Sequence, residues 1–181
     1  MKVLPESWET EHLHIRDCAL SEVKRLQEVF NACAYVGRWD KTFHVETEET
    51  FINLISTSLS GGDNLDKPFK MQSIRMKGNT EIIGYFHMYY RSPRPDIVWM
   101  SMFVIHPNCQ KFHFGSEVVA RLSEQIKQID EYTAIWLEVY LKNWPALRFW
   151  IMMGFTSIIE YRGDKIPADD SFASLVLEKR L

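Results

Sequence analysis

The sequence IHPNCQKFHFGSEVV, residues 105–119, joins two segments with different periodicities. An apolar run typical of a strand ends at Pro107, and a helical pattern of apolar residues begins after Gly115. A strand, a short loop and a helix present unpaired backbone N–H groups at the helix N-terminus, where the helix dipole favours an anion. The segment therefore predicts a phosphate site, with a plain connecting loop as the alternative interpretation.

The segments on either side predict a chain in which helices and strands alternate in blocks. Ser21 is a candidate N-cap for the first helix, and Asn143 and Gly154 bracket the last one. We expect helices at 21–33, 46–59, about 116–129 and 144–153, and strands at 13–16, 69–76, 81–90, 96–105, 134–141, 155–161 and 171–181. This order predicts an α/β (α+β) fold over residues 1–181: a single-domain, mixed, mostly antiparallel sheet of about seven strands flanked by helices.

Composition limits the classes of function. The 21 Lys and Arg against 24 Asp and Glu give a net charge of −3, so no overall field attracts nucleic acid or an anionic membrane. Three cysteines without C-x-x-C spacing predict neither a disulfide framework nor a metal site. No run approaches the roughly 20 apolar residues of a membrane span, and the first residues lack a signal-peptide core, so we expect a cytoplasmic protein.

A second segment, IWLEVYLKNWPALRFWIMMGF at residues 135–155, gives the loop its context. Together the two segments resemble the acetyl-CoA-binding core of the GCN5-related N-acetyltransferase (GNAT) superfamily. The N-terminal residues ETEHLHIRD and SEVKRLQEVFN are similar to the branch that contains ribosomal-protein N-terminal acetyltransferases. The resemblance is most specific at Ile105, Pro107, Gln110, Gly115, Leu137, Val139, Asn143, Ala146, Phe149, Gly154 and Phe155.

The resemblance implies the acyl-CoA N-acyltransferase (GNAT) fold, acetyl-CoA as cofactor and a set of binding residues. The backbone of Phe103, Val104 and Ile105 is expected to pair with the pantetheine arm. Asn143 is expected near the thiol, with a purely capping role as the alternative. The remaining expected contacts are pyrophosphate-binding amides at Gln110, Lys111, Phe112, His113, Phe114, Gly115 and Ser116, and Trp150 close to the cofactor.

The sequence departs from the family pattern at two of these positions. His113 stands where the family has a glycine, and its amide donates equally well if its φ is negative, whereas a left-handed backbone costs roughly 1–2 kcal/mol. Lys111 and His113 either add a charged contact to phosphate or are simply exposed. Trp150 stands where the family often has a proton-donating tyrosine, and an indole N–H cannot release a proton at neutral pH.

Three residues are candidates for catalysis. A free amine with a pKa near 10 is mostly protonated at pH 7, so a base is needed. Glu138, within an otherwise apolar strand, is the first choice, because burial would tune it for proton transfer; an exposed salt bridge is the alternative. His106 is a second candidate base, or a solvated loop residue. Tyr140, on the same strand face as Glu138, is a candidate acid for the thiolate. Backbone N–H groups near Val104 are expected to polarise the thioester carbonyl.

These expectations describe an N-acetyltransferase that acts on a primary amine, either a peptide N-terminus or a small molecule. A non-catalytic acyl-CoA-binding module is the alternative, and the acidic balance argues against a nucleic-acid-binding domain. Family members often associate, so a homodimer is compatible with the resemblance. We expect the acceptor pocket around residues 36–43 and 61–68, and an aromatic run including Tyr89 and Trp99 to form core and cleft wall.

Overall fold

The computed structural model describes residues 2–40, 42–62, 66–166 and 168–181. The strands are β1 (Ser7–Glu9), β2 (Leu13–Asp17), β3 (Phe69–Met76), β4 (Ile82–Tyr90), β5 (Ile97–Ile105), β6 (Ala134–Tyr140), β7 (Ser157–Gly163) and β8 (Ala173–Arg180). The α-helices are α1 (Val23–Asn31), α2 (Glu48–Leu59), α3 (Phe114–Lys127) and α4 (Trp144–Met152), and the 3-10 turns are η1 (Leu20–Glu22), η2 (Ala34–Arg38) and η3 (Pro107–Cys109).

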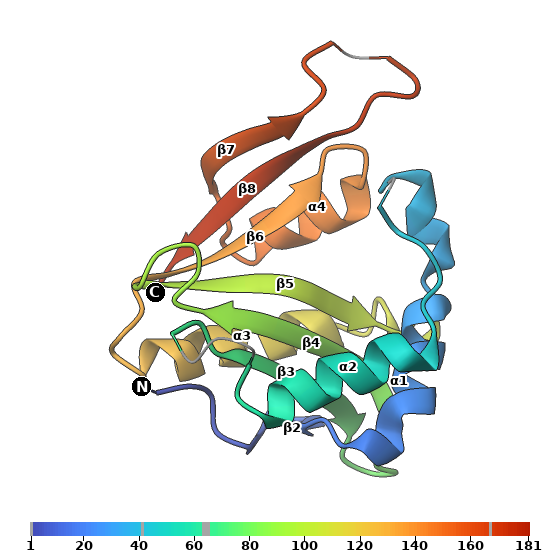
Figure 1. The fold of residues 1–181 in the computed structure, drawn as a ribbon, viewed down its shortest axis with the longest axis vertical. Coiled ribbons are helices and arrows are strands. Elements are labelled where there is room, and N and C mark those ends of the chain that lie inside the picture. Colours follow the sequence, from blue (N-terminus) through green and yellow to red (C-terminus); the bar gives the residue numbers. More distant parts are fainter. Residues whose placement is uncertain (1, 41, 63–65, 167) are drawn as a thin grey trace.

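The described strands form one sheet in the order β1-β2-β3-β4-β5-β6-β8-β7. Neighbours pair antiparallel except for β5 and β6, which are parallel. Helices cover both faces, with α2 in front of β3 to β5 and α3 behind them in Figure 1. On the front, Phe51 of α2 packs with Tyr85, and on the back Leu122 of α3 and Leu147 of α4 join a larger core with Phe86.

The prediction of a mixed, mostly antiparallel sheet flanked by helices is confirmed, with eight strands instead of about seven. The additional strand, β1, has only three residues and one buried side chain, Trp8, so it carries no detectable alternation. Its indole nitrogen donates to Gln72 Oε1 at 2.8 Å, a contact between distant parts of the sequence. The Ser21 cap is wrong: Ser21 lies within η1, and Glu22 precedes α1 with its carboxylate held by Arg16 and Arg75.

A bulge in β5 determines how the sheet opens. His87 pairs with Met102 and Met88 with Met100, which leaves Ser101 as an extra residue in β5. An extra residue bends a strand and increases its twist. The parallel pairing of β5 with β6 ends one residue earlier, at Met100 and Leu137. Beyond that pair the two strands diverge, as Figure 1 shows, and each presents an unpaired edge.

Two further findings concern the predicted setting of the protein. No helix among the described residues is long and apolar enough to cross a membrane. Cys18, Cys33 and Cys109 are all free thiols, and burial raises the pKa of Cys33 to about 11. A thiol with a raised pKa is a weak nucleophile at neutral pH, so Cys33 is a packing residue.

The close approach of β4 and β5 beside the bulge gives a stability prediction. A Cβ at Gly84 would lie 2.3 Å from Val104 O and 2.8 Å from Ile105 Cδ1. We expect Gly84→Ala to lower the free energy of unfolding by about 1–3 kcal/mol, because the backbone of β5 must shift. Gly78→Ala is the matched control, since a Cβ there has no neighbour within 4 Å. Urea denaturation measures both, and equal stability of the two variants would contradict the tight approach.

Candidate active site

The first element of the site is the edge of β5 that faces β6. His106 N–H donates to Ile83 O at 2.7 Å. The alternation of an antiparallel pair then turns the backbone of Val104 toward β4, and the backbones of Phe103 and Ile105 toward the open edge. Phe103 and Ile105 can therefore bind a ligand that lies along β5, whereas the polar backbone groups of Val104 are used within the sheet.

The second element is the loop between β5 and α3. Gln110 N–H donates to Pro107 O at 3.2 Å, but none of the next six backbone N–H groups, at residues 111–116, donates to a described residue. Lys111 and His113 are left-handed, with φ of 68° and 64°, and Phe112 between them is not. Such alternation makes successive N–H groups form an anion-binding concavity. The N-terminus of α3 thus offers six free amides where its dipole favours negative charge.

The expected negative φ at His113 is wrong, and the loop carries backbone strain at two residues that are not glycine. A left-handed conformation costs roughly 1–2 kcal/mol at each. His113 is the N-cap of α3, but its side chain caps no amide. The side chains of Lys111, Phe112 and His113 are all exposed. The strain therefore serves the direction of the amides, and the two basic side chains stand beside them.

Two candidate residues hold the loop in place. His106 Nδ1 accepts a hydrogen bond from Asn108 N–H at 3.3 Å and so caps η3. Gln110 Nε2 donates to Ile105 O at 2.9 Å and to the hydroxyl of Tyr35, on η2, at 3.0 Å. The predictions assigned His106 to catalysis and the amide of Gln110 to the pyrophosphate. In the structure both side chains fix the loop, and Gln110 connects it to η2.

An aromatic cluster lies behind the open edge. The rings of Phe103 and Phe149 stack at 6.1 Å, and Trp150, only 8% exposed, packs edge-on against both. A Cβ at Gly115 would lie 3.5 Å from each phenyl ring, so the first turn of α3 is in contact with this cluster. Asn143 Oδ1 accepts from Ala146 N–H at 3.3 Å and caps α4, as predicted from sequence.

Glu138 follows directly after the last residue of β6 that pairs with β5, on the front face. Its side chain is 30% exposed, so the expectation that burial tunes it is wrong: once β5 and β6 diverge, nothing covers this position. Arg162 Nη1 lies 2.9 Å from Glu138 Oε2, and the hydroxyl of Ser174 donates to Oε1. The salt-bridge interpretation therefore describes this carboxylate when no acceptor is bound.

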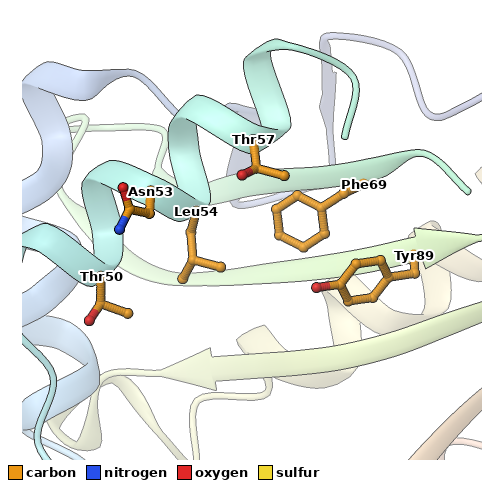
Figure 2. A pocket seen from close by; sticks show the side chains of 6 residues that line it. All are labelled: Thr50, Asn53, Leu54, Thr57, Phe69 and Tyr89. Carbon is orange, nitrogen blue, oxygen red and sulfur yellow. The ribbon is translucent and has the colours of Figure 1, made fainter. Parts of the chain in front are cut away.

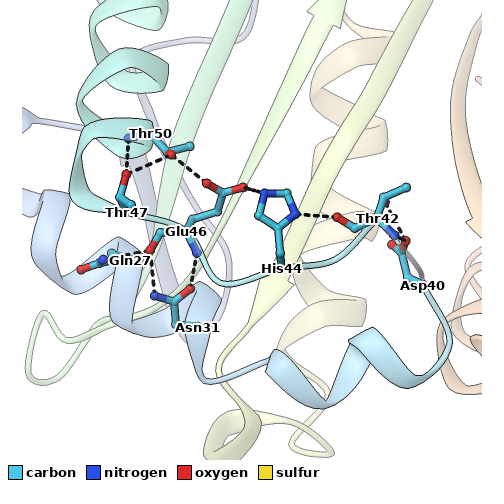
Figure 3. Close-up of polar contacts among 8 residues, drawn as sticks. All are labelled: Gln27, Asn31, Asp40, Thr42, His44, Glu46, Thr47 and Thr50. Carbon is cyan, nitrogen blue, oxygen red and sulfur yellow. Dashed lines mark hydrogen bonds and ion pairs between the residues drawn. The ribbon is translucent and has the colours of Figure 1, made fainter.

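Tyr140 lies two residues further along β6, against the loop between η2 and α2. Burial raises the pKa of Tyr140, and a hydrogen bond to Thr42 opposes the rise, so the phenol keeps its proton at neutral pH. Figure 3 shows how this loop is anchored. Gln27 and Asn31 of α1 donate to Glu46 O at 2.9 and 3.0 Å, and Glu46 also binds Thr50 of α2. Of the segments predicted to form the acceptor pocket, residues 41 and 63–65 lie outside the described residues.

Two hollows open on the front face and share Tyr89, which is 38% exposed. Figure 2 shows the first, of about 300 Å³, between the α2 residues Thr50, Asn53, Leu54 and Thr57 and the rings of Phe69 and Tyr89. The second, of about 350 Å³, is lined by Tyr89, Ser92, Pro93, Trp99 and Arg162. Sequence reasoning missed Arg162, because nothing in the local pattern of β7 connects it with Glu138. No group of three or more potential metal ligands occurs among the described residues.

Comparisons with known proteins agree with this arrangement. Residues 24–155 match the family model described as Acetyltransferase (GNAT) family. Similar solved structures include a GNAT-family acetyltransferase from Bacillus anthracis (TM-score 0.74, 16% identity, covering 96% of this chain and 98% of the other). Another is an acetyltransferase from Thermus thermophilus (TM-score 0.69, 18% identity, 96% and 100% coverage). A third is the PaiA N-acetyltransferase from Thermoplasma acidophilum in complex with coenzyme A (TM-score 0.64, 13% identity, 93% and 99% coverage).

Solved structures at this level of identity establish the fold alone, and a comparison with curated proteins gives no significant match. The family model, in contrast, spans the bulged strand, the loop with six free amides, the diverging strand and α4. The chain belongs to the acetyltransferase (GNAT) family.

Proposed function

We propose that residues 1–181 act as one domain that transfers the acetyl group of acetyl-CoA to a primary amine. The observation that carries this proposal is the run of six free backbone N–H groups at residues 111–116 beside the unpaired edge of β5. Backbone amides at a helix N-terminus suit a diphosphate, and an unpaired strand edge suits the amides of a pantetheine arm. The fit supports coenzyme A as the group that this surface holds.

Each part of the surface has a distinct role in this proposal. The N–H groups of residues 111–116 donate to the diphosphate, with Lys111 and His113 beside them. Phe103 and Ile105 offer backbone groups to the pantetheine amides, and Asn143 lies at the far end of the open edge, at the start of α4. The PaiA relative was solved in complex with coenzyme A, which supports the same ligand on this fold.

Acetyl transfer also requires proton movements that this chain can perform. Bound acetyl-CoA supplies the activated acetyl group. Glu138 accepts the proton of the incoming ammonium group, so that the neutral amine can attack. Tyr140, on the same face and protonated at neutral pH, donates a proton to the departing thiolate. Trp150 takes no part in proton transfer, because it is buried among aromatic rings.

The acceptor approaches from the front face, where the two hollows and the loop between η2 and α2 lie. Both a peptide N-terminus and a small primary amine reach Glu138 from this side. The similarity of the N-terminal segment to the ribosomal-protein branch favours a peptide, whereas the small volumes of the hollows favour a small molecule. The three free thiols fit a reducing, cytoplasmic setting.

The role of the amides predicts a difference between two ligands. Coenzyme A at 100 times its dissociation constant should stabilise the fold by about 2.7 kcal/mol. Pantetheine at the same concentration should give a much smaller rise in melting temperature, because it lacks the diphosphate. Thermal unfolding with each ligand measures this. Equal rises would place the binding energy outside the amides, and no rise with either ligand would remove the proposal.

The role of Glu138 predicts a pH-dependent loss. We expect Glu138→Gln to lower kcat/KM about 100-fold or more at pH 7, the usual range for losing a general base. The loss should shrink towards pH 10, because the fraction of free amine rises tenfold per pH unit below its pKa. Thiol release measures both rates. Glu124→Gln is the matched control, since Glu124 forms a surface pair with Arg121 at 2.9 Å. Full activity of Glu138→Gln at pH 7 would leave Glu138 as a structural salt-bridge residue.

The role of Tyr140 predicts a smaller effect. We expect Tyr140→Phe to lower kcat by up to about 100-fold without changing the dissociation constant of coenzyme A, because a thiolate leaves more easily than most groups. Tyr161→Phe is the control, since the hydroxyl of Tyr161 donates to Asp164 O on the far strand β7. Steady-state kinetics with a binding measurement separates the two constants. An unchanged kcat would assign the proton to water.

A further inference from the structure

Arg162 on β7 crosses the sheet to the point where β5 and β6 diverge. Its guanidinium lies 5.7 Å from the centre of the Trp99 ring. Nη1 is 2.9 Å from Glu138 Oε2, and Nη2 is 2.7 Å from Glu160 Oε2. One cation of this chain thus sits on an aromatic face and against the carboxylate that the proposed function uses as a base.

The surroundings of Arg162 favour a positive charge. Two carboxylates surround one guanidinium, and no other described Lys or Arg pairs with Glu138 or Glu160. The nearby Arg94 lies over Trp136 and pairs with Asp96 instead. If the guanidinium leaves Glu138, the hollow keeps an aromatic face and an unpaired carboxylate, which together attract a cation.

This position is also where the reacting amine has to arrive. Glu138 is the first residue of β6 beyond the last rung that joins β5 and β6, Met100 to Leu137. The open edge of β5 begins at the same level, and Trp99 lies one residue before Met100 on the front face, in register with Trp136. An acceptor that enters the hollow lined by Tyr89, Trp99 and Arg162 therefore meets the open edge at Glu138.

We propose that the acceptor binds as an ammonium ion between Trp99 and Glu138, in the place that the guanidinium of Arg162 occupies when no acceptor is present. The inference rests on the proposed function and names its substrate class: primary amines that carry no carboxylate near the amine. Arg162 is a specificity-determining residue that competes with the acceptor for Glu138. When displaced, it keeps its pair with Glu160, through both Nε and Nη2 at 2.9 and 2.7 Å.

Arg162 is partly exposed, with 42% of its side-chain surface accessible, so displacement does not require the sheet to open. An exposed ion pair and an exposed cation–π contact are both weak. A substrate ammonium ion can therefore replace Arg162 at Glu138 without a large barrier. The same weakness sets the size of the expected effect when the competing cation is removed.

Three acceptors of equal chain length test the substrate class: 1-aminobutane, 1,4-diaminobutane and 4-aminobutanoate. With the proposed function intact, we expect the lowest KM for the diamine and the highest for the carboxylate, which Glu160 repels. We expect Arg162→Ala to lower the KM of both uncharged-tail and diamine acceptors about fivefold, with little change in kcat. Arg162→Gln, which preserves size and hydrogen bonding, should give the same shift if Arg162→Ala folds poorly.

The matched control is Arg121→Ala, because Arg121 has a similar exposure of 41% and pairs with Glu124 on α3, on the other face of the sheet. Its KM values should equal those of the unchanged protein. A KM that rises in both Arg162 variants, or a preference for 4-aminobutanoate, would show that Arg162 anchors an anionic acceptor and would overturn the inference. An unchanged KM in both variants would show that the guanidinium does not compete.

Calorimetric titration of 1,4-diaminobutane into the protein separates this inference from the proposed function. If coenzyme A binds but no amine is acetylated, the transfer proposal fails, and the titration still decides the inference. Binding that strengthens about fivefold in Arg162→Gln and is lost in Trp99→Leu supports the cation site. No heat of binding in any of these proteins would overturn it.

Discussion

The structure depends on one local irregularity, the extra residue Ser101 in β5. The bulge ends the pairing of β5 with β6 and exposes the edge on which a ligand can lie. The hydroxyl of Ser101 lies 2.9 Å from Nδ1 of His87 across the bulge. Burial lowers the pKa of His87 to about 4, so the imidazole is neutral at physiological pH and needs no counter-ion there. A hydrogen bond between neutral groups thus fixes the bend without placing a charge in the core.

The loop that follows shows how an acidic protein can hold a dianionic group. The net charge of −3 supplies no general attraction for phosphate, so the binding energy has to come from local dipoles. Six unpaired amides and the end of α3 provide them, at the cost of left-handed backbone at Lys111 and His113. The side chain of Gln110 keeps the loop in position by joining it to Ile105 and to Tyr35. Strain at a ligand-binding loop that the surrounding contacts stabilise is a common feature of functional sites.

The sequence predicted most of the regular elements because their apolar residues follow clear periods: Val118, Leu122 and Ile126 are all fully buried on α3. The cap of α4 by Asn143 was also predictable, since it is a local interaction. The misses depend on contacts between distant parts of the chain. β1 exists because Trp8 reaches Gln72, and Glu138 is exposed because β5 bends away from it. The role of Arg162 required knowing that β8 lies between β6 and β7.

Amide hydrogen exchange with and without coenzyme A tests the central claim most directly, because it observes each backbone N–H separately. The account predicts slower exchange in the ligand-bound protein at residues 111–116 and at Phe103 and Ile105, with no change at Val104, whose backbone is already used by β4. Protection of the loop without protection of β5 would contradict the role of the bulge. Exchange unchanged at residues 111–116 in protein saturated with coenzyme A would contradict the account as a whole.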